Sequence, residues 1–422
     1  MKGVKSKEII YYILLLICLT TWTNSDALPP MPLRLAFMLA VLFPLWVNKS
    51  RLLPEIFFTF VVLSAASYAV SYMPVDGLYV LITILLSVII LGKNKGQNIK
   101  VPQSFMILCL LSLLIDTICS SGVVVTFNWI SIIIVAAVLF QADDKMQVHY
   151  MAFSFAIISL VLSLEFILVG DRFITNVNTL EGVLDRKGWT DPNYFGSIVG
   201  MGIITSLIEL VRGNSYNGKI RIFYVCTIIL SMFTLFMTAS RGAFVALACS
   251  SMLLLFCVRI RNTYRLTILI LSVIVLFLMY KFHALDMLIL RFISDAGDAG
   301  GRTEIWLPRM TAFFNECTPL QWLFGIGTDA SMTLGTNQYI GFHNDYLAIL
   351  VRYGIVGFVC LLGLLFKPLN YSFRDKGLVK VALLYFALCM FSIEPFSGGQ
   401  WGCLYFYLYI LVLSQIGYER AI

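Results

Sequence analysis

The sequence has little charge and no paired cysteines. Only 13% of its residues are Asp, Glu, Lys or Arg, and its mean hydropathy is +0.88, which excludes a soluble globular protein. The ten cysteines include no CxxC pair and lie almost entirely within apolar runs. Neither a disulfide framework nor a cysteine metal cluster is therefore predicted.

The chain also lacks the motifs of several common enzyme classes. It has no P-loop, no HExxH zinc motif, no GxSxG nucleophile motif, no Rossmann glycine pattern and no Asp-rich metal motif. We therefore predict that the protein uses no metal and no other cofactor.

Long apolar runs are present instead, and hydrophobic residues make up 59% of the chain. Each run is long enough to cross a hydrocarbon core of roughly 30 Å. Continuous runs favour helices over the alternating segments of a membrane β-barrel. The first run, at residues 9–21, is followed by no small-residue cleavage site and is predicted to be an uncleaved helix. We predict an all-α polytopic membrane bundle of about 12 to 14 helices.

The net charge of +7 orients these helices and does not indicate nucleic-acid binding. Of the 30 Lys and Arg, 20 fall in alternate short loops, which the positive-inside rule assigns to the cytoplasm. This pattern gives 14 spans with both termini in the cytoplasm, or 12 if residues 101–141 are divided differently. The basic loops comprise residues 2–7, 49–51, 93–100, 145, 212–221, 259–265, 367–380 and 420.

We divide the chain into N-terminal transmembrane helices, residues 1–170, and a catalytic transmembrane region, residues 171–422. The second region holds two long outer loops, at about 171–191 and 281–342. Loops of this length are usually functional. In the longer loop, Trp306, Met310 and Phe314 recur every four residues, which predicts an amphipathic helix on the membrane surface or on the bundle.

A His-Asn pair stands where the longer loop re-enters the membrane. His343 and Asn344 are followed after nine residues by Gly354, and then by Gly357. A histidine here can accept a proton near neutral pH, or it can be an interfacial hydrogen-bonding or pore-lining residue. Asn344 or Asp345 can cap the following helix. The two glycines favour close packing of helix backbones.

Three arginines outside the cytoplasmic loops have distinctive surroundings. Arg241 lies between Ser240 and a glycine, and Arg302 follows two glycines and precedes Trp306. Arg352 lies inside the His-Asn helix, where a charge is costly unless it is paired or faces water. Guanidinium groups match phosphate oxygens, and neighbouring glycines admit a bulky head group. These arginines indicate either lipid headgroup anchors or a site for an anionic substrate.

A helix start closes the shorter loop. Asp191 precedes Pro192, and Asn193 follows, which is typical of the first turn of a helix and also suits the binding of a phosphate or a sugar hydroxyl. Acidic residues in or beside the predicted spans are candidate partners of the arginines: Asp116, Glu165 and Glu394.

In this order along the chain, these motifs resemble the O-antigen ligase and O-antigen polymerase superfamily of bacterial envelope glycosyltransferases. The resemblance covers about residues 185–415 and includes the large outer loop before the His-Asn helix. The motifs that carry it are Asp191-Pro192-Asn193, Ser240-Arg241-Gly242-Ala243, Gly301-Arg302 with Trp306, and His343-Asn344 with Gly354 and Gly357.

The resemblance implies a glycosyltransferase of the bacterial inner membrane, with its active site facing the periplasm. Such enzymes take a glycan from an undecaprenyl-diphosphate carrier and pass it to an acceptor hydroxyl, without a metal. Arg241 and Arg302 would bind the donor diphosphate, and His343 would position or deprotonate the acceptor, giving inversion at the anomeric carbon. The substrate-binding candidates are Asn344, Asp191, Asn193, Ser240, Trp306 and Arg352.

The acceptor distinguishes two activities. A second lipid-linked repeat unit makes the protein a polymerase, and lipid A-core makes it a ligase. Residues 191–195 favour the polymerase, which we prefer, although the His-Asn spacing fits a ligase. Expected partners are the lipid-linked oligosaccharide, the acceptor glycolipid, membrane lipids and a chain-length regulator, with no nucleic acid.

A flippase for lipid-linked oligosaccharides is the alternative from another class. The sequence shows no internal repeat, and its unusual residues gather at one face of the membrane. Both features disfavour a transporter with a midplane site.

Overall fold

The computed structural model describes most of the chain from residue 103 onwards. The predicted spans that begin near residues 9, 31, 54, 76 and 123 lie outside the described residues, and so does Asp191. The described residues are 103–119, 133, 144–169, 174–179, 182–187, 192–212, 218–258, 262–281, 286, 288–289, 292–293, 302–336, 340–370, 376–396 and 401–416.

Helices occupy each predicted span position that falls within these residues, which confirms a helical membrane protein. By length and composition, three of the described helices can cross a membrane: Pro192–Arg212, Gly218–Met237 and Asp345–Asn370. The helices are α5 Gln103–Ile118, α7 Asp144–Val169, α8 Pro192–Arg212, α9 Gly218–Met237, α10 Arg241–Cys257, α11 Asn262–Lys281, α13 Thr303–Glu316, α14 Pro319–Phe324, α15 Thr328–Thr333, α16 Asp345–Phe366, the 3-10 turn η3 Lys367–Asn370, α17 Lys376–Cys389 and α18 Trp401–Ile416.

One β-hairpin departs from the all-α prediction. It lies in the shorter predicted outer loop, where β1 (Ile174–Thr179) pairs antiparallel with β2 (Gly182–Lys187). Four of the six residues in the β1 sequence ITNVNT are Ile, Val or Thr, whose branched side chains favour strands. The loop is too polar to continue a membrane helix, so local pairing satisfies its backbone groups instead.

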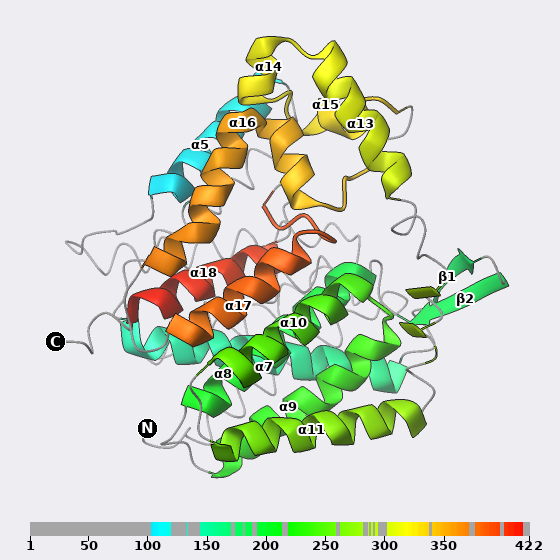
Figure 1. Ribbon diagram of the computed structural model, residues 1–422, viewed down its shortest axis with the longest axis vertical. Coiled ribbons are helices and arrows are strands. Elements are labelled where there is room, and N and C mark those ends of the chain that lie inside the picture. The colour runs from blue at the N-terminus through cyan, green and yellow to red at the C-terminus, as the bar shows by residue number, and fades with distance from the viewer. Residues whose placement is uncertain are drawn as a thin grey trace, which may run out of the picture.

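The helices form two groups (Figure 1). One group is a bundle of α7 to α11 with α17 and α18, in which α8 packs against α7, α9, α10 and α17. The other contains α5 and α13 to α16, where α16 packs on α5 and α14. The amphipathic helix predicted in the longer loop is α13. It places Trp306 and Met310 against a small buried cluster, whereas Phe314 is exposed.

Polar side chains join the central helix α8 to its neighbours. The hydroxyl of Ser159 on α7 donates to the carbonyl of Val199 at 2.9 Å and lies 2.7 Å from the hydroxyl of Ser231 on α9. The hydroxyl of Tyr385 on α17 donates to the carbonyl of Ser197 at 2.9 Å. Such bonds satisfy buried polar groups within an apolar bundle and fix the relative heights of the helices.

Gly200 permits the close contact between α8 and α17. A Cβ at this position would overlap the hydroxyl of Tyr385. We expect Gly200→Ala to lower the free energy of unfolding by about 1–3 kcal/mol through overpacking, despite the better helix propensity of alanine. Thermal unfolding in detergent measures this change. Gly218→Ala is the matched control, because no atom lies within 4 Å of its added Cβ. Equal melting temperatures for the two variants would contradict the packing argument.

Candidate functional site

A short turn between α17 and α18, residues 390–396, contacts the starts of several helices. At the start of α16, the Asp345 N–H donates to the Met390 carbonyl at 2.9 Å, and the Asp345 carboxylate accepts the Phe396 N–H at 2.7 Å. At the start of α8, the Tyr194 hydroxyl accepts the N–H of Glu394 at 3.2 Å. The 390–396 turn therefore fixes the starts of α8 and α16 relative to each other.

Both arginines predicted to be catalytic come from segments that contact this turn. Arg302, directly before α13, donates to the carbonyl oxygens of Phe391 at 3.2 Å and Ser392 at 3.3 Å. Arg241 is the first residue of α10, and the next residue, Gly242, lies so close to Ser392 that a Cβ would overlap its side chain. The turn thus brings together the α10 start, the α13 start and the His-Asn segment.

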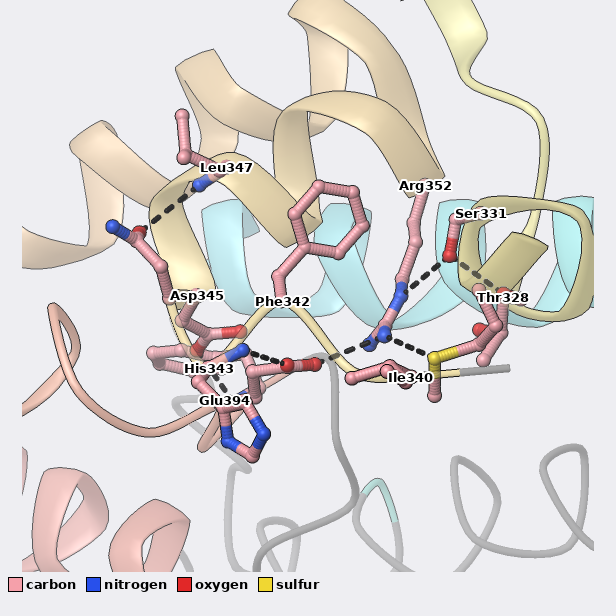
Figure 2. Close-up of polar contacts among 12 residues, drawn as sticks. Thr328, Ser331, Ile340, Phe342, His343, Asp345, Leu347, Arg352 and Glu394 are labelled. Atoms are coloured by element: carbon pink, nitrogen blue, oxygen red, sulfur yellow. Dashed lines mark hydrogen bonds and ion pairs between the residues drawn. The ribbon is translucent and has the colours of Figure 1, made fainter. Parts of the chain in front are cut away.

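His343 has an unusual backbone conformation. Its φ is +51°, in the left-handed region that residues other than glycine rarely adopt. Its N–H donates to the carboxylate of Glu394 at 2.6 Å, while its imidazole points away from Phe342 and Arg352 (Figure 2). The buried Nδ1 of the imidazole has no hydrogen-bond partner among the described residues. The ring is therefore directed away from Arg352 and has an uncommitted nitrogen.

The residues on either side of His343 are fixed by side-chain bonds. Asn344 caps α16, its side-chain oxygen accepting the N–H of Leu347 at 3.2 Å. On the other side, the indole N–H of Trp306 donates to the carbonyl of Phe342 at 2.7 Å. The capping role predicted for Asn344 is confirmed, and Trp306 now has a contact that positions the chain just before the histidine.

The remaining candidate residues that the structure describes are Asn193, Ser240 and Arg352. Asn193 and Ser240 meet at the starts of α8 and α10, with their side-chain oxygens 3.5 Å apart. Arg352 is buried and pairs with Glu394 at 2.9 Å, while its Nε donates to the hydroxyl of Ser331 at 3.0 Å. The expectation that Arg352 is paired within its apolar helix is confirmed. Direct binding of substrate by these three candidates stays a prediction.

The comparison with known families gives one match. Residues 226–362 match the family model described as O-antigen ligase. We call this matched segment, residues 226–362, the O-antigen ligase domain. This match supports the superfamily indicated by the sequence motifs, which covers O-antigen ligases and related polymerases. No curated protein and no solved structure shows significant similarity to the chain. Arg241, Arg302 and His343 lie inside the O-antigen ligase domain, whereas Tyr194 and Glu394 lie outside it.

Within the O-antigen ligase domain, α16 is broken at Gly354, where φ is +66°. The two halves of α16 lie on different axes in Figure 1. The break frees the carbonyls of Val351 and Arg352, which accept the N–H groups of Ile326 at 3.1 Å and Gly327 at 3.0 Å. The close backbone approach predicted at Gly354 is present. Its partner is the end of α14, at Leu323 and Phe324, and α16 is kinked there.

Arg309 of the O-antigen ligase domain was not singled out from the sequence. It is buried, donates to the carbonyls of Met332 and Ile340 at 2.6 Å each, and lies 4.7 Å from the centre of the Phe342 ring. Burial lowers the pKa of its guanidinium. Its position in the sequence could have indicated a structural role. Arg309 follows Trp306 by three residues and so lies on the apolar side of the helix, where a charged side chain needs partners within the protein.

Asp116 links α5 to the O-antigen ligase domain. Its carboxylate accepts the Thr328 N–H at 2.9 Å and the Tyr353 hydroxyl at 3.0 Å. Glu394 is the ion-pair partner of Arg352, and the side chain of Glu165 lies outside the described residues. Sequence reasoning named these acids without assigning their partners. Asp116 fixes the kinked part of α16 against α5.

The kink of α16 provides a direct stability test. In Gly354→Ala, the new Cβ would overlap the carbonyl of Leu323 and the residue would keep a positive φ. We expect the free energy of unfolding to fall by about 2–5 kcal/mol. Gly363→Ala is the control in the same helix, because its nearest neighbouring atom lies at an ordinary 3.8 Å. Thermal unfolding of both variants in detergent distinguishes a required kink from a general intolerance of alanine in α16.

Proposed function

We propose that this protein is an O-antigen polymerase of the bacterial inner membrane. It transfers a glycan from an undecaprenyl-diphosphate carrier to a hydroxyl of a second lipid-linked repeat unit, at the periplasmic face. The observation that carries the proposal is the convergence at the 390–396 turn. One histidine with an uncommitted ring nitrogen and two arginine-bearing helix starts meet there.

The reaction follows from the roles assigned to these groups. The acceptor hydroxyl oxygen attacks the anomeric carbon of the donor glycan, and its proton passes to the imidazole of His343. The bond between that carbon and the diphosphate oxygen breaks, and its electron pair leaves with the diphosphate. Attack opposite the leaving group inverts the anomeric carbon. His343 then releases the proton to water.

Both arginines stand at helix starts, where a diphosphate would be stabilised. Arg241 is the first residue of α10, and Arg302 occupies the N-cap position of α13. Unpaired N–H groups and the helix dipole make a helix start favourable for an anion, and a guanidinium adds charged hydrogen bonds. The first turn of α10 contains no acidic residue that would oppose this effect, whereas the first turn of α13 contains Glu304. Stabilising the departing negative charge lowers the barrier to transfer.

The acceptor separates the two candidate activities. The start of α8 supports the polymerase, because the polymerase-like residues 191–195 supply Tyr194 to the site. A ligase that transfers the glycan to lipid A-core is the second candidate, because the matching family model is described as O-antigen ligase. Both activities use the same donor chemistry at His343, Arg241 and Arg302.

Removing the imidazole tests the catalytic role of His343. We expect His343→Asn to reduce transfer from a diphosphate-linked donor by about 100- to 10,000-fold, the usual contribution of a general base. Asparagine is chosen because it tolerates a positive φ, so that the backbone is retained. The assay follows radiolabelled glycan in proteoliposomes, with donor binding measured in parallel. Transfer at the wild-type rate by this variant would overturn the assignment.

Deleting the gene separates the acceptor classes. A lost polymerase leaves lipid A-core carrying a single repeat unit, which a surface-glycan gel resolves as one short band. Bare core together with polymer on the carrier lipid would instead identify a ligase. Single repeats trapped on the cytoplasmic leaflet would point to a flippase. Complementation with the His343→Asn chain provides the control for loss of transfer without loss of the protein.

A further inference from the structure

Glu394 contacts both the main chain at His343 and the buried Arg352. One carboxylate oxygen accepts the main-chain N–H of His343 at 2.6 Å, and the other pairs with Arg352 at 2.9 Å (Figure 2). The carboxylate also lies against Gly341, where an added Cβ would stand 2.9 Å from the oxygen that binds His343. Glu394 thus occupies a fitted position beside the chain that leads into His343.

We propose that Glu394 is a positioning residue for His343. Its carboxylate holds the main chain of His343 in the left-handed conformation and so sets the direction of the imidazole. The proposal rests on the proposed function of His343 as the base in glycan transfer. Glu394 lies beyond residues 226–362, so the family match assigns it no role.

The backbone conformation of His343 needs such a partner. A positive φ is disfavoured roughly tenfold or more for a residue with a Cβ. Because the Cα–Cβ bond direction depends on φ, a relaxed backbone would turn the imidazole away from its present direction. The short bond from the His343 N–H to a charged acceptor opposes that relaxation, since charged hydrogen bonds are stronger than neutral ones.

The position of Glu394 is itself fixed by buried contacts. Arg352 is fully buried, and its Nε donates to the hydroxyl oxygen of Ser331. The Ser331 hydroxyl in turn donates to the carbonyl of Thr328 at 2.6 Å. The N–H of Thr328 reaches Asp116 on α5. A continuous set of hydrogen bonds and one ion pair therefore runs from α5 through Arg352 and Glu394 to the amide of His343.

The 390–396 turn also contacts the segments that carry Arg241 and Arg302, the arginines proposed to bind the diphosphate. Ser392, two residues before Glu394, accepts from Arg302 and lies against Gly242. Movement of Glu394 would displace the imidazole relative to Arg302 and Arg241 together. Loss of the positioning contact should therefore lower the rate of transfer more than it lowers donor binding.

Two double variants isolate the contact with the His343 amide. Glu394→Gln/Arg352→Met keeps an oxygen that can accept this N–H, and Glu394→Leu/Arg352→Met removes it. Arg352→Met is present in both, so neither variant buries an unpaired arginine. We expect kcat of the leucine variant to be at least about tenfold below that of the glutamine variant, with similar KM for the lipid-linked donor.

Amide hydrogen exchange gives a readout that does not depend on transfer. The peptide containing residues 341–345 should exchange about tenfold faster in the leucine variant than in the glutamine variant, because only the latter protects the His343 N–H. Equal kcat and equal exchange in the two double variants would overturn the proposal. If exchange differs as expected but His343→Asn transfers normally, the catalytic role of His343 fails while the backbone contact stands.

Glu209→Gln is the matched control for loss of a buried carboxylate. Glu209 is also buried and paired with an arginine, Arg212, at 3.1 Å, but lies at the opposite end of α8 from Tyr194. We expect this variant to change thermal stability without changing kcat per folded molecule. A tenfold fall in its kcat would show that any buried ion pair produces the effect, and would count against a specific role for Glu394.

Discussion

The Arg352–Glu394 ion pair lies within an apolar protein interior and constrains the candidate site around it. Neither charge can remain there alone, because an unpaired buried charge costs about 3–5 kcal/mol when its partner is removed. The pair therefore ties the α16 helix to the 390–396 turn. The ion pair with Arg352 fixes the position of the Glu394 carboxylate, and this position determines where it accepts the His343 N–H. The geometry at the histidine follows from the need to neutralise the buried arginine.

The starts of four helices meet around the turn. α8, α10, α13 and α16 each present their first residues to residues 390–396 through a hydrogen bond or a close packing contact. Helix starts carry partial positive charge, so their convergence suits a negatively charged head group before any arginine is added. The proposed donor, an anionic lipid diphosphate, has the charge that such a place attracts.

The two helix groups have different parts in this arrangement. Gly196, Gly200 and Gly202 allow close packing around α8, which sets the height of Tyr194 in the bundle. The kink at Gly354 lets α16 turn away from its axis and places Arg352 next to α15. The site lies where the two groups meet, because the 390–396 turn follows α17 of the bundle and contacts α13 and α16.

The sequence by itself determined the class of protein and indicated the residues of the candidate site. Apolar runs of spanning length admit only membrane helices, and the order of the Arg241, Arg302 and His343 motifs indicated the superfamily. A loop sequence as short as β1 could not reveal its hairpin, because strand pairing depends on a partner. Arg309 was missed because its bonds go to the backbone of residues far along the chain.

Only the tertiary structure decided which charged groups pair and how the histidine is held. Arg352 lies on α16 and Glu394 lies in the 390–396 turn, so no local spacing rule joins them. The positive φ of His343 and the break at Gly354 are stabilised by contacts with distant segments, the 390–396 turn and the loop after α14. The local sequence determines which backbone conformations are accessible at low energy. Long-range hydrogen bonds and buried charges then select the conformation that forms.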